Sequence, residues 1–517
     1  MDTKKILNFC LEKGLLIDSE ILGLFENEKD IESIKLIIEK INNSSQTKII
    51  TKDFLKTNYA QIDKLFSTLP SQNKKVLEKL KIKLGLSIEI SKESEFFTNK
   101  QEIPEKASVR ILSKNFFVNK KIEVKDFVTY FRNRFYEMKN LLQDSHKIDD
   151  LISINKLSSN KQGVSIIGMV CDKKTTKNKN IIFDVEDLTG NIKILVTRNK
   201  EEIYKKAEDV ALDSVLAFKC SGNREILFLN DIIFPDSILF ERKKSPIEEY
   251  ALFIGDIHYG SKNFMEENFL KFIDYLNGKI PNTPEVEKIK YLFIAGDLIT
   301  GVGNYPNQEK DLKIMDLEEQ FSRIADLLGK IRKDIQIIIS PGNHEGIRLM
   351  EPQPLYDEKY AWRLYEMDNV ILTENPSLIN IGAKKNFPGF DVLYYHGFSF
   401  PYYASNISSL MTIKAMNFPE KIMAYLLKNR HLAPTHASVQ YFPAGKDPHI
   451  IRKIPDIFFS GHTHKSAAIY YNNILIVSSS SWESLTPYQE KFGNVPDHCK
   501  VPIINLKTRA IKILDFE

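Results

Sequence analysis

The spacing of apolar residues gives the first part of the chain a helical character. Over residues 1–90 these residues recur at helical intervals, as in IESIKLIIEKI and VLEKLKIKLGL, with polar breaks such as NNSSQ between the segments. This pattern predicts a small α-helical N-terminal domain. Residues 91–148 are predicted to form a linker and a connecting helix. A polar stretch without a period precedes KDFVTYFRNRFYEMKNLL, whose aromatic residues on neighbouring turns indicate core packing.

Between residues 149 and 240 the pattern changes to short β-prone runs. The runs are VSIIGMV, NIIFDVED, IKILVT, SVLAFKC and REILFLNDII, and the helical interval KEEIYKKAEDV falls between the third and the fourth. Five strands with a helix after the third is the order of an OB-fold, an all-β barrel that often binds single-stranded nucleic acid. We therefore expect an OB-like middle domain.

The turn between the first two of these runs, KKTTKNKN, is strongly basic. One interpretation is that its lysines contact the phosphate backbone of single-stranded DNA. The alternative is a solvated hairpin tip, because charge runs usually face water. The sequence leaves both open. The lysines concerned are Lys173, Lys174, Lys177 and Lys179.

From residue 249 to residue 517 strands and helices alternate, and polar residues follow directly after five apolar runs. The segments are YALFIGDIHYGS, YLFIAGDLITG, IQIIISPGNHEG, VLYYHGFS and DIFFSGHTHKS. Because a glycine beside the polar group lets the backbone turn sharply, and the carboxyl ends of strands in an α/β fold meet in one crevice, these side chains are expected to converge if the strands share one sheet. They are Asp256, His258, Asp297, Asn343, His344, His396, His462 and His464.

These side chains are suited to binding metal ions. Aspartate, histidine and asparagine without cysteine favour Mn, Fe or Zn over an all-oxygen Mg²⁺ site. All of them except His344 together suffice for two divalent cations about 3.5–4 Å apart that share one carboxylate. Asp297, alone in its segment, is the natural bridge. We expect Mn foremost, with Fe and Zn as alternatives.

Each of these residues is a weak indication when taken singly, since a lone histidine is more often a core or surface residue. Chance becomes a poor explanation when GDxH, GDxx, GNHE, HG and GHxH follow one another at strand ends. The other histidines lack such contexts and are interpreted as structural. They are His146, His431, His436, His449 and His498.

Composition limits the class of protein. A chain of 517 residues with 43% hydrophobic residues predicts two or three globular domains, and a formal net charge of +4 is too small to demand a nucleic-acid partner. The four cysteines are widely separated and form no CxxC pair, which favours a reducing compartment. No stretch approaches the roughly 20 apolar residues of a membrane span. We therefore expect a cytoplasmic protein without a membrane partner.

The five blocks together resemble the calcineurin-like metallophosphoesterases, across roughly Glu249 to Glu517. This resemblance implies an α/β sandwich of two sheets flanked by helices, with a dinuclear metal centre at its rim. The wider arrangement is similar to the small-subunit family of archaeal DNA polymerase D. That similarity rests on the helical N-terminal region, the DFVTYFRNRFYEMKNLL helix, the OB-like domain, GDIHYGS, GDLITGVGNYPNQ, PGNHE, RHLAPTH and PDIFFSGHTH, and it is least specific over the first 90 residues.

The closer resemblance implies a 3′–5′ exonuclease that hydrolyses DNA phosphodiesters for proofreading. It implies that His344 faces the substrate phosphate as the catalytic residue. It also implies how the ligands divide. One metal is held by Asp256, His258 and His464, the other by Asn343, His396 and His462, and Asp297 is shared between them.

The implied partners are the large catalytic subunit of the polymerase, single-stranded DNA and primer 3′ ends. The OB-like barrel then either docks the large subunit or contacts DNA, and we favour docking for the barrel with the basic loop as a secondary DNA contact. Two other classes of protein stay open. One is a noncatalytic polymerase scaffold subunit, and the other is a stand-alone metallophosphoesterase or repair nuclease.

Overall fold

The structure is a computed structural model, and the residues it describes are 3–18, 35, 38–39, 49–50, 108–113, 121–145, 147–443, 445–486, 489–490 and 495–517. The chain separates into two compact units, Met1–Glu102 and Ile103–Glu517. In the first unit the described part consists of helix α1 (Thr3–Glu12) and the parallel pair β1 (Leu16–Ile17) and β2 (Ile49–Ile50). Most of the predicted N-terminal helical domain lies outside the described residues.

Residues 162–233 form a closed five-stranded barrel. The strands pair in the order β4-β5-β6-β8-β7, and β7 also pairs with β4. Alternate residues of a strand face the interior, as Phe183 and Val185 do on β5. Each of the five β-prone runs falls on one of these strands. Their bounds are β4 (Gln162–Thr175), β5 (Ile181–Asp187), β6 (Gly190–Val196), β7 (Val215–Gly222) and β8 (Leu227–Ile233), with helix α8 (Glu201–Glu208) between β6 and β7.

Two six-stranded sheets build the C-terminal domain. Their strand orders are β12-β11-β10-β9-β18-β19 and β16-β17-β15-β14-β13-β3. Strands β9 to β12 run parallel in the first sheet, as do β14, β15 and β17 in the second. The first sheet contains β9 (Tyr250–Ile254), β10 (Ile289–Ala295), β11 (Gln336–Ser340), β12 (Val370–Leu372), β18 (Lys500–Asn505) and β19 (Ile511–Asp515). The second contains β3 (Val109–Ile111), β13 (Ser377–Ile381), β14 (Phe390–Tyr394), β15 (Ile457–Ser460), β16 (Ala467–Tyr471) and β17 (Ile474–Ser478).

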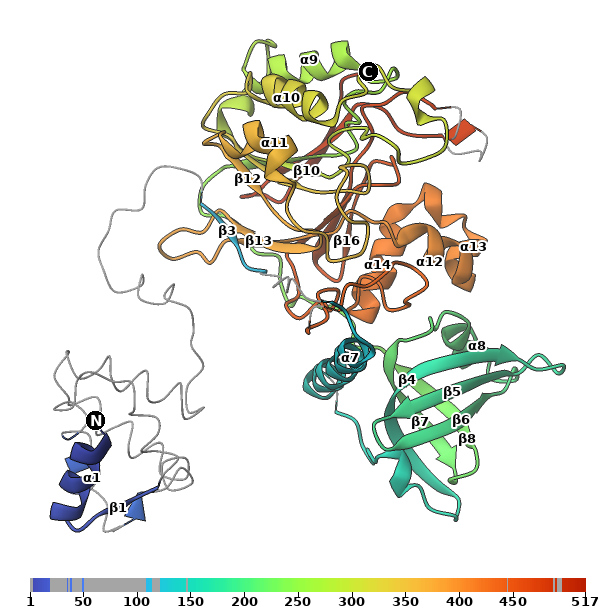
Figure 1. Ribbon diagram of the computed structural model, residues 1–517. Helices are drawn as coiled ribbons and strands as arrows, with labels where there is room; N and C mark the ends of the chain where they lie inside the picture. Colours follow the sequence, from blue (N-terminus) through green and yellow to red (C-terminus); the bar gives the residue numbers. More distant parts are fainter. Residues whose placement is uncertain are drawn as a thin grey trace. The chain divides into compact units, whose positions relative to one another are not determined.

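Helices cover the outer face of each sheet, so the strands are buried on both sides (Figure 1). On β9, Leu252 and Ile254 face the helices, while Phe253 faces the other sheet and lies 5.0 Å from the ring of Phe459. Burial on both faces explains why these strands are continuous apolar runs. The helices are α9 (Glu266–Leu276), α10 (Leu317–Leu328) and α11 (Glu358–Tyr365) on the first sheet, and α12 (Phe400–Asn406), α13 (Ser408–Thr412) and α14 (Pro419–Asn429) on the second.

The described residues also form short 3₁₀ helices. They are η2 (Ile154–Lys156), η3 (Val286–Lys288), η4 (Gln308–Lys310) and η5 (Ala415–Asn417).

Within the described part of the chain, none of the helices combines the length and hydrophobicity needed to cross a lipid bilayer.

One segment differs from the sequence analysis. Val109–Ile111 falls in the predicted linker, but the structure places it as strand β3 at the edge of the second sheet, where it pairs with β13. Three residues are too few to show a strand period, and the pairing partner lies far along the chain at Ile379–Ile381. The pairing was therefore not detectable from local pattern.

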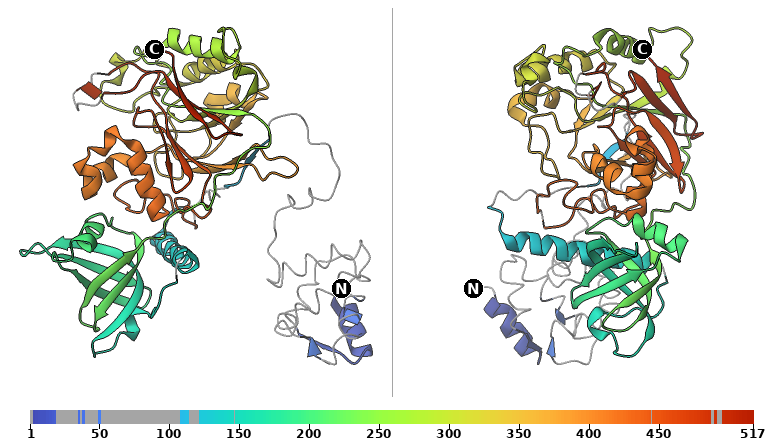
Figure 2. Two further views of the ribbon diagram at one scale, coloured as in Figure 1. Left: turned by 180° about the vertical axis from the view of Figure 1, so that it is seen from behind. Right: turned by 90° about the vertical axis from the view of Figure 1, so that its right-hand side faces the viewer.

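Helix α7 (Val124–Ser145) joins the barrel to the two-sheet domain, and Figure 2 shows it lying beside the barrel. Its residues Phe135 and Met138 pack against the barrel, whereas Tyr130 packs against Tyr441 of the two-sheet domain. The aromatic residues on this helix therefore serve core packing at two junctions.

A buried ion pair fixes α7 to the two-sheet domain. Arg134 lies with its Nε 2.5 Å from Oδ2 of Asp447 and donates from Nη1 to the carbonyl oxygen of Pro434 at 2.7 Å. Nε2 of His431 lies 2.9 Å from the same Asp447 oxygen. Burial alone raises the pKa of Asp447, but Arg134 and His431 outweigh burial and hold it well below its usual range. The helix is thus bound through a charge that has no access to water.

We expect Arg134→Ala to loosen α7 strongly, because it leaves the Asp447 carboxylate buried without its cation. The loss should be about 3 kcal/mol or more, seen as roughly 100-fold faster hydrogen exchange at the α7 amides. The matched control is Arg132→Ala on the same helix, whose side chain is exposed and should change exchange little. Equal exchange rates in the two variants would contradict this role of the ion pair.

Candidate metal centre

The predicted polar residues converge at one edge of the two-sheet domain. They follow strands of both sheets rather than of one, because the sheets pack face to face with the carboxyl ends of their parallel strands at the same edge. Asp256 and His258 come after β9, Asp297 after β10, Asn343 and His344 after β11, His396 after β14, and His462 and His464 after β15.

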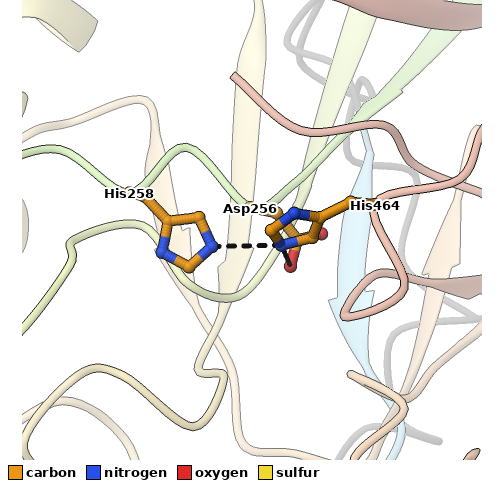
Figure 3. Close-up of side chains that lie close together, drawn as sticks. All are labelled: Asp256, His258 and His464. Atoms are coloured by element: carbon orange, nitrogen blue, oxygen red, sulfur yellow. Dashed lines mark hydrogen bonds and ion pairs between the residues drawn. The ribbon is translucent and has the colours of Figure 1, made fainter. Parts of the chain in front are cut away.

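The first group consists of Asp256, His258 and His464 (Figure 3). The Nε2 atoms of the two histidines lie 3.2 Å apart, and Nε2 of His464 is 3.4 Å from Oδ1 of Asp256. All three side chains are buried. Since two imidazole nitrogens at this distance cannot both carry a proton, at least one lone pair points into the group, as a metal site requires.

The second group consists of Asp297, His396 and His462, with Asn343 between the two histidines. Nδ1 of His396 lies 2.8 Å from the carbonyl oxygen of Ala295 and therefore donates to it. Its Nε2 then faces Oδ1 of Asn343 at 2.9 Å and Oδ2 of Asp297 at 3.5 Å. Neither oxygen carries a proton to donate, so the position attracts a cation. These residues fit a divalent metal.

His344 belongs to a third group, with His258 and Asp297. Its Nε2 is 3.9 Å from Oδ2 of Asp297, and its side chain keeps 20% of its surface exposed. Nδ1 lies 2.9 Å from the carbonyl oxygen of Thr300, and the amide of Asn304 lies 3.2 Å from that nitrogen. Because Nδ1 is engaged by the loop, Nε2 is the nitrogen that faces the centre.

Electrostatics favour an ionised carboxylate within this cluster. Burial alone raises the pKa of Asp297, but the imidazoles of His344 and His396 outweigh burial and hold that pKa well below its usual range. Burial lowers the pKa of His396, yet the carboxylate of Asp297 reverses the effect and raises it to about 10. Burial, followed by repulsion from His396, lowers the pKa of His462 to about 3. The neutral imidazole of His462 and the ionised carboxylate of Asp297 are in the states that bind metal, whereas His396 holds a proton that a metal ion would have to displace.

The backbone is strained at the predicted ligands. Five of them adopt the left-handed conformation, which costs an L-residue roughly 1–2 kcal/mol. Glycines allow the loops to approach closely, since a Cβ on Gly342 would meet Oδ1 of Asp297 at 2.3 Å and one on Gly461 would meet Oδ2 of Asp256 at 2.7 Å. The φ angles are 50° at Asp256, 51° at His258, 45° at Asp297, 68° at His462 and 54° at His464.

Sequence reasoning assigned no role to Glu345, which ties two of these loops together. Its carboxylate accepts from the backbone N–H of Leu298 at 2.7 Å and of Gly342 at 2.9 Å. Burial, with repulsion from Asp297, raises its pKa to about 8. The only signal in the sequence was its place in PGNHEG directly after His344, and the sequence alone does not show which groups the carboxylate binds.

The lysines of the basic segment are not members of this cluster: Lys173 and Lys174 lie at the end of strand β4, and Lys177 and Lys179 lie on the connection from β4 to β5. Lys173 is half-buried and donates to the carbonyl oxygens of Glu208 and Val210 at the end of α8, at 2.5 and 3.2 Å. Lys174 is paired with Asp172. Lys177 and Lys179 are exposed.

The histidines interpreted as structural are placed as follows. His431 and His449 are buried and bound to carboxylates, with Nε2 of His449 2.8 Å from Oε2 of Glu351. The exposed ring of His436 packs against Tyr441, with ring centroids 4.7 Å apart. His498 has a buried Nδ1 without a hydrogen-bond partner among the described residues. His146 lies outside the described residues.

Residues 251–466 match the family model of the calcineurin-like phosphoesterases, and this range contains all the converging residues. The C-terminal region therefore has the calcineurin-like phosphoesterase fold, which implies divalent metal ions. The full chain also has curated relatives. The DNA polymerase II small subunit of Methanothermobacter thermautotrophicus is 33% identical over 76% of this chain and 80% of its own length.

The chain belongs to the DNA polymerase II small subunit family. Further members are those of Pyrococcus furiosus, 36% identical over 76% of this chain and 64% of its own length, and Methanocaldococcus jannaschii, 36% identical over 74% of this chain and 64% of its own length. The matched part of the chain thus covers less than two thirds of these two longer relatives. The resemblance drawn from the sequence motifs is confirmed at the level of the family.

We expect the chain to bind two Mn²⁺ ions and Asp297→Asn to bind fewer than one. The physical reason is that Asp297 Oδ2 lies within 3.5–3.9 Å of imidazole nitrogens of His258, His344 and His396, so its charge serves both halves of the cluster. Equilibrium dialysis against Mn²⁺ with elemental analysis gives the ratio. Asp274→Asn on α9, whose side chain is 48% exposed, is the matched control and should keep both ions. Two ions on the Asp297 variant would contradict a bridging role.

Proposed function

We propose that this chain is the small subunit of a two-subunit replicative DNA polymerase and carries a metal-dependent 3′–5′ exodeoxyribonuclease for proofreading. The observation that supports it is the cluster in which Asp297 lies among three imidazoles that come from both sheets. Membership of the family supports the assignment to a polymerase complex, since the relatives are named as DNA polymerase II small subunits. In this proposal the substrates are single-stranded DNA and primer 3′ ends.

The proposed division of the ligands follows the family resemblance, and two of the three groups of neighbouring side chains support it. When bound, the two divalent ions supply an activated water and neutralise charge on the phosphodiester. Asp256, His258 and His464 would hold one ion, Asn343, His396 and His462 would hold the other, and Asp297 would be shared.

His344 supplies the acid in the proposed reaction. The oxygen of a water molecule bonds to phosphorus and the water loses one proton to solvent, the bond from phosphorus to the 3′ oxygen breaks, and a nucleoside 5′-monophosphate leaves. Nε2 of His344 faces the centre and donates a proton to the departing 3′ oxygen, while Thr300 holds Nδ1. His344 is the more exposed of the imidazoles around Asp297, which suits a group that contacts substrate.

The middle barrel is proposed to be an OB-fold that docks the large catalytic subunit. Its strand order and the helix between the third and fourth strands support the assignment. Part of the barrel surface is occupied by the two-sheet domain of the same chain. Oγ1 of Thr435 donates to the carbonyl oxygen of Leu212, and the hydroxyl of Tyr425 donates to the carbonyl oxygen of Asp209, both at 2.8 Å. The proposed domains are 1–90, helical; 91–148, linker and helix; 149–240, OB-like; and 249–517, nuclease.

The test of the nuclease is degradation of 5′-labelled single-stranded DNA in Mn²⁺, with products that shorten from the 3′ end and with loss of activity in chelator. His344→Ala should lower the rate on the order of 10²-fold or more while both metal ions stay bound, because it removes an acid but no ligand. His436→Ala, at an exposed histidine outside the cluster, is the matched control.

Two results would count against the proposal. A chain that binds metal but degrades no DNA is a scaffold subunit, and hydrolysis of small phosphate esters alone indicates a different metallophosphoesterase. If His344→Ala loses metal together with activity, the residue is a ligand.

The exposed lysines of the barrel loop give a separate prediction. Lys177→Gln with Lys179→Gln should flatten the dependence of log K on log salt for single-stranded DNA by at most about 1.4, since each phosphate contact contributes about 0.7. Lys173 is excluded because it holds the end of α8. If the slope is unchanged and binding of the large subunit is weakened, the loop contacts the large subunit and not DNA.

A further inference from the structure

Phe398 presents an aromatic ring directly at the metal centre. It lies two residues after His396, in the turn between β14 and α12. Its ring centroid is 5.6 Å from that of His462, at an interplanar angle of 73°. The side chain is only partly buried. A partly exposed apolar ring therefore lies beside a proposed metal ligand, although nothing in ligand binding requires it.

The ring is held firmly from behind. Phe398 packs against the buried cluster of Tyr130, Ala433, Val439 and Tyr441, which combines helix α7 with the loop before β15. Its turn is fixed as well: Gly397 has a φ of 114°, and the N–H of Ser399 donates to the hydroxyl of Tyr395 at 3.2 Å. A ring that is held by this packing and is still partly accessible loses little freedom when a ligand covers its accessible part.

The chemistry of the substrate suggests what covers this face. A phosphodiester in DNA reaches the centre with a base one sugar away, and bases of any sequence stack on aromatic rings. Stacking suits an exonuclease because it selects an unpaired end without selecting a sequence. We propose that Phe398 stacks on the base of the 3′-terminal nucleotide and so makes the centre select unpaired single-stranded ends. The inference rests on the proposed function.

The competing explanation is that Phe398 only supports the ring of His462. The two explanations differ in which substrates are cleaved more slowly when the ring is removed. A support acts on every substrate through the metal ligand, whereas stacking requires a base. A terminal nucleotide that lacks its base separates them.

The experiment measures kcat/KM on two single-stranded oligonucleotides, one with a natural 3′-terminal nucleotide and one with a tetrahydrofuran abasic residue in its place. We expect wild-type protein to prefer the natural end by about 10- to 100-fold, the range that stacking on one aromatic side chain provides. Phe398→Leu keeps an apolar side chain against the buried cluster but has no flat ring, and it should lose this preference. Phe398→Tyr should retain it. Phe240→Ala, at a fully exposed phenylalanine, is the matched control and should also retain it.

Each outcome decides the matter. If Phe398→Leu slows both substrates equally, or leaves the preference intact, Phe398 does not stack and the inference fails while the nuclease stands. If wild-type protein cleaves both ends equally, the inference also fails. If wild-type protein with Mn²⁺ cleaves neither, the proposed function fails and this inference fails with it.

Discussion

The buried carboxylate of Asp297 is the group around which the loops at the edge of the two sheets are arranged. It is buried, yet its pKa is held well below its usual range by imidazoles that come from other strands. A buried charge of this kind is tolerable only when opposite charge surrounds it at close range. His258 and His344 follow strands of the same sheet as Asp297, and His396 follows a strand of the other sheet. The two sheets must therefore pack correctly for the imidazoles to surround this carboxylate.

Bringing these side chains together destabilises the local backbone. Left-handed ligands, and loops so close that Gly342 and Gly461 have no room for a side chain, are unfavourable on their own. The interior between the sheets offsets them with tightly packed rings, of which Phe253 and Phe293 stack at 5.2 Å. The site is thus held in a strained geometry by strands that are buried on both faces and cannot relax with it.

The convergence of these side chains could be predicted from the sequence because polar residues of a few types stand directly after strands. The same local reasoning predicts the five strands of the barrel. It fails where a partner lies far along the chain. Strand β3 pairs with β13, and the converging residues follow strands of two sheets, a division that the local pattern does not reveal because sheet membership depends on long-range pairing. Lys173 belongs to a charge run but caps α8, which no pattern within the run indicates.

Helix α7 connects these levels of organisation. It binds the barrel through Phe135, binds the two-sheet domain through the ion pair of Arg134 with Asp447, and places Tyr130 behind Phe398. The same helix thus packs on the barrel on one side and, on the other, belongs to the cluster against which Phe398 packs. Under the proposed docking of a large subunit on the barrel, α7 would connect the docking surface to the surroundings of Phe398 through packing and a buried ion pair, rather than through the proposed metal ligands.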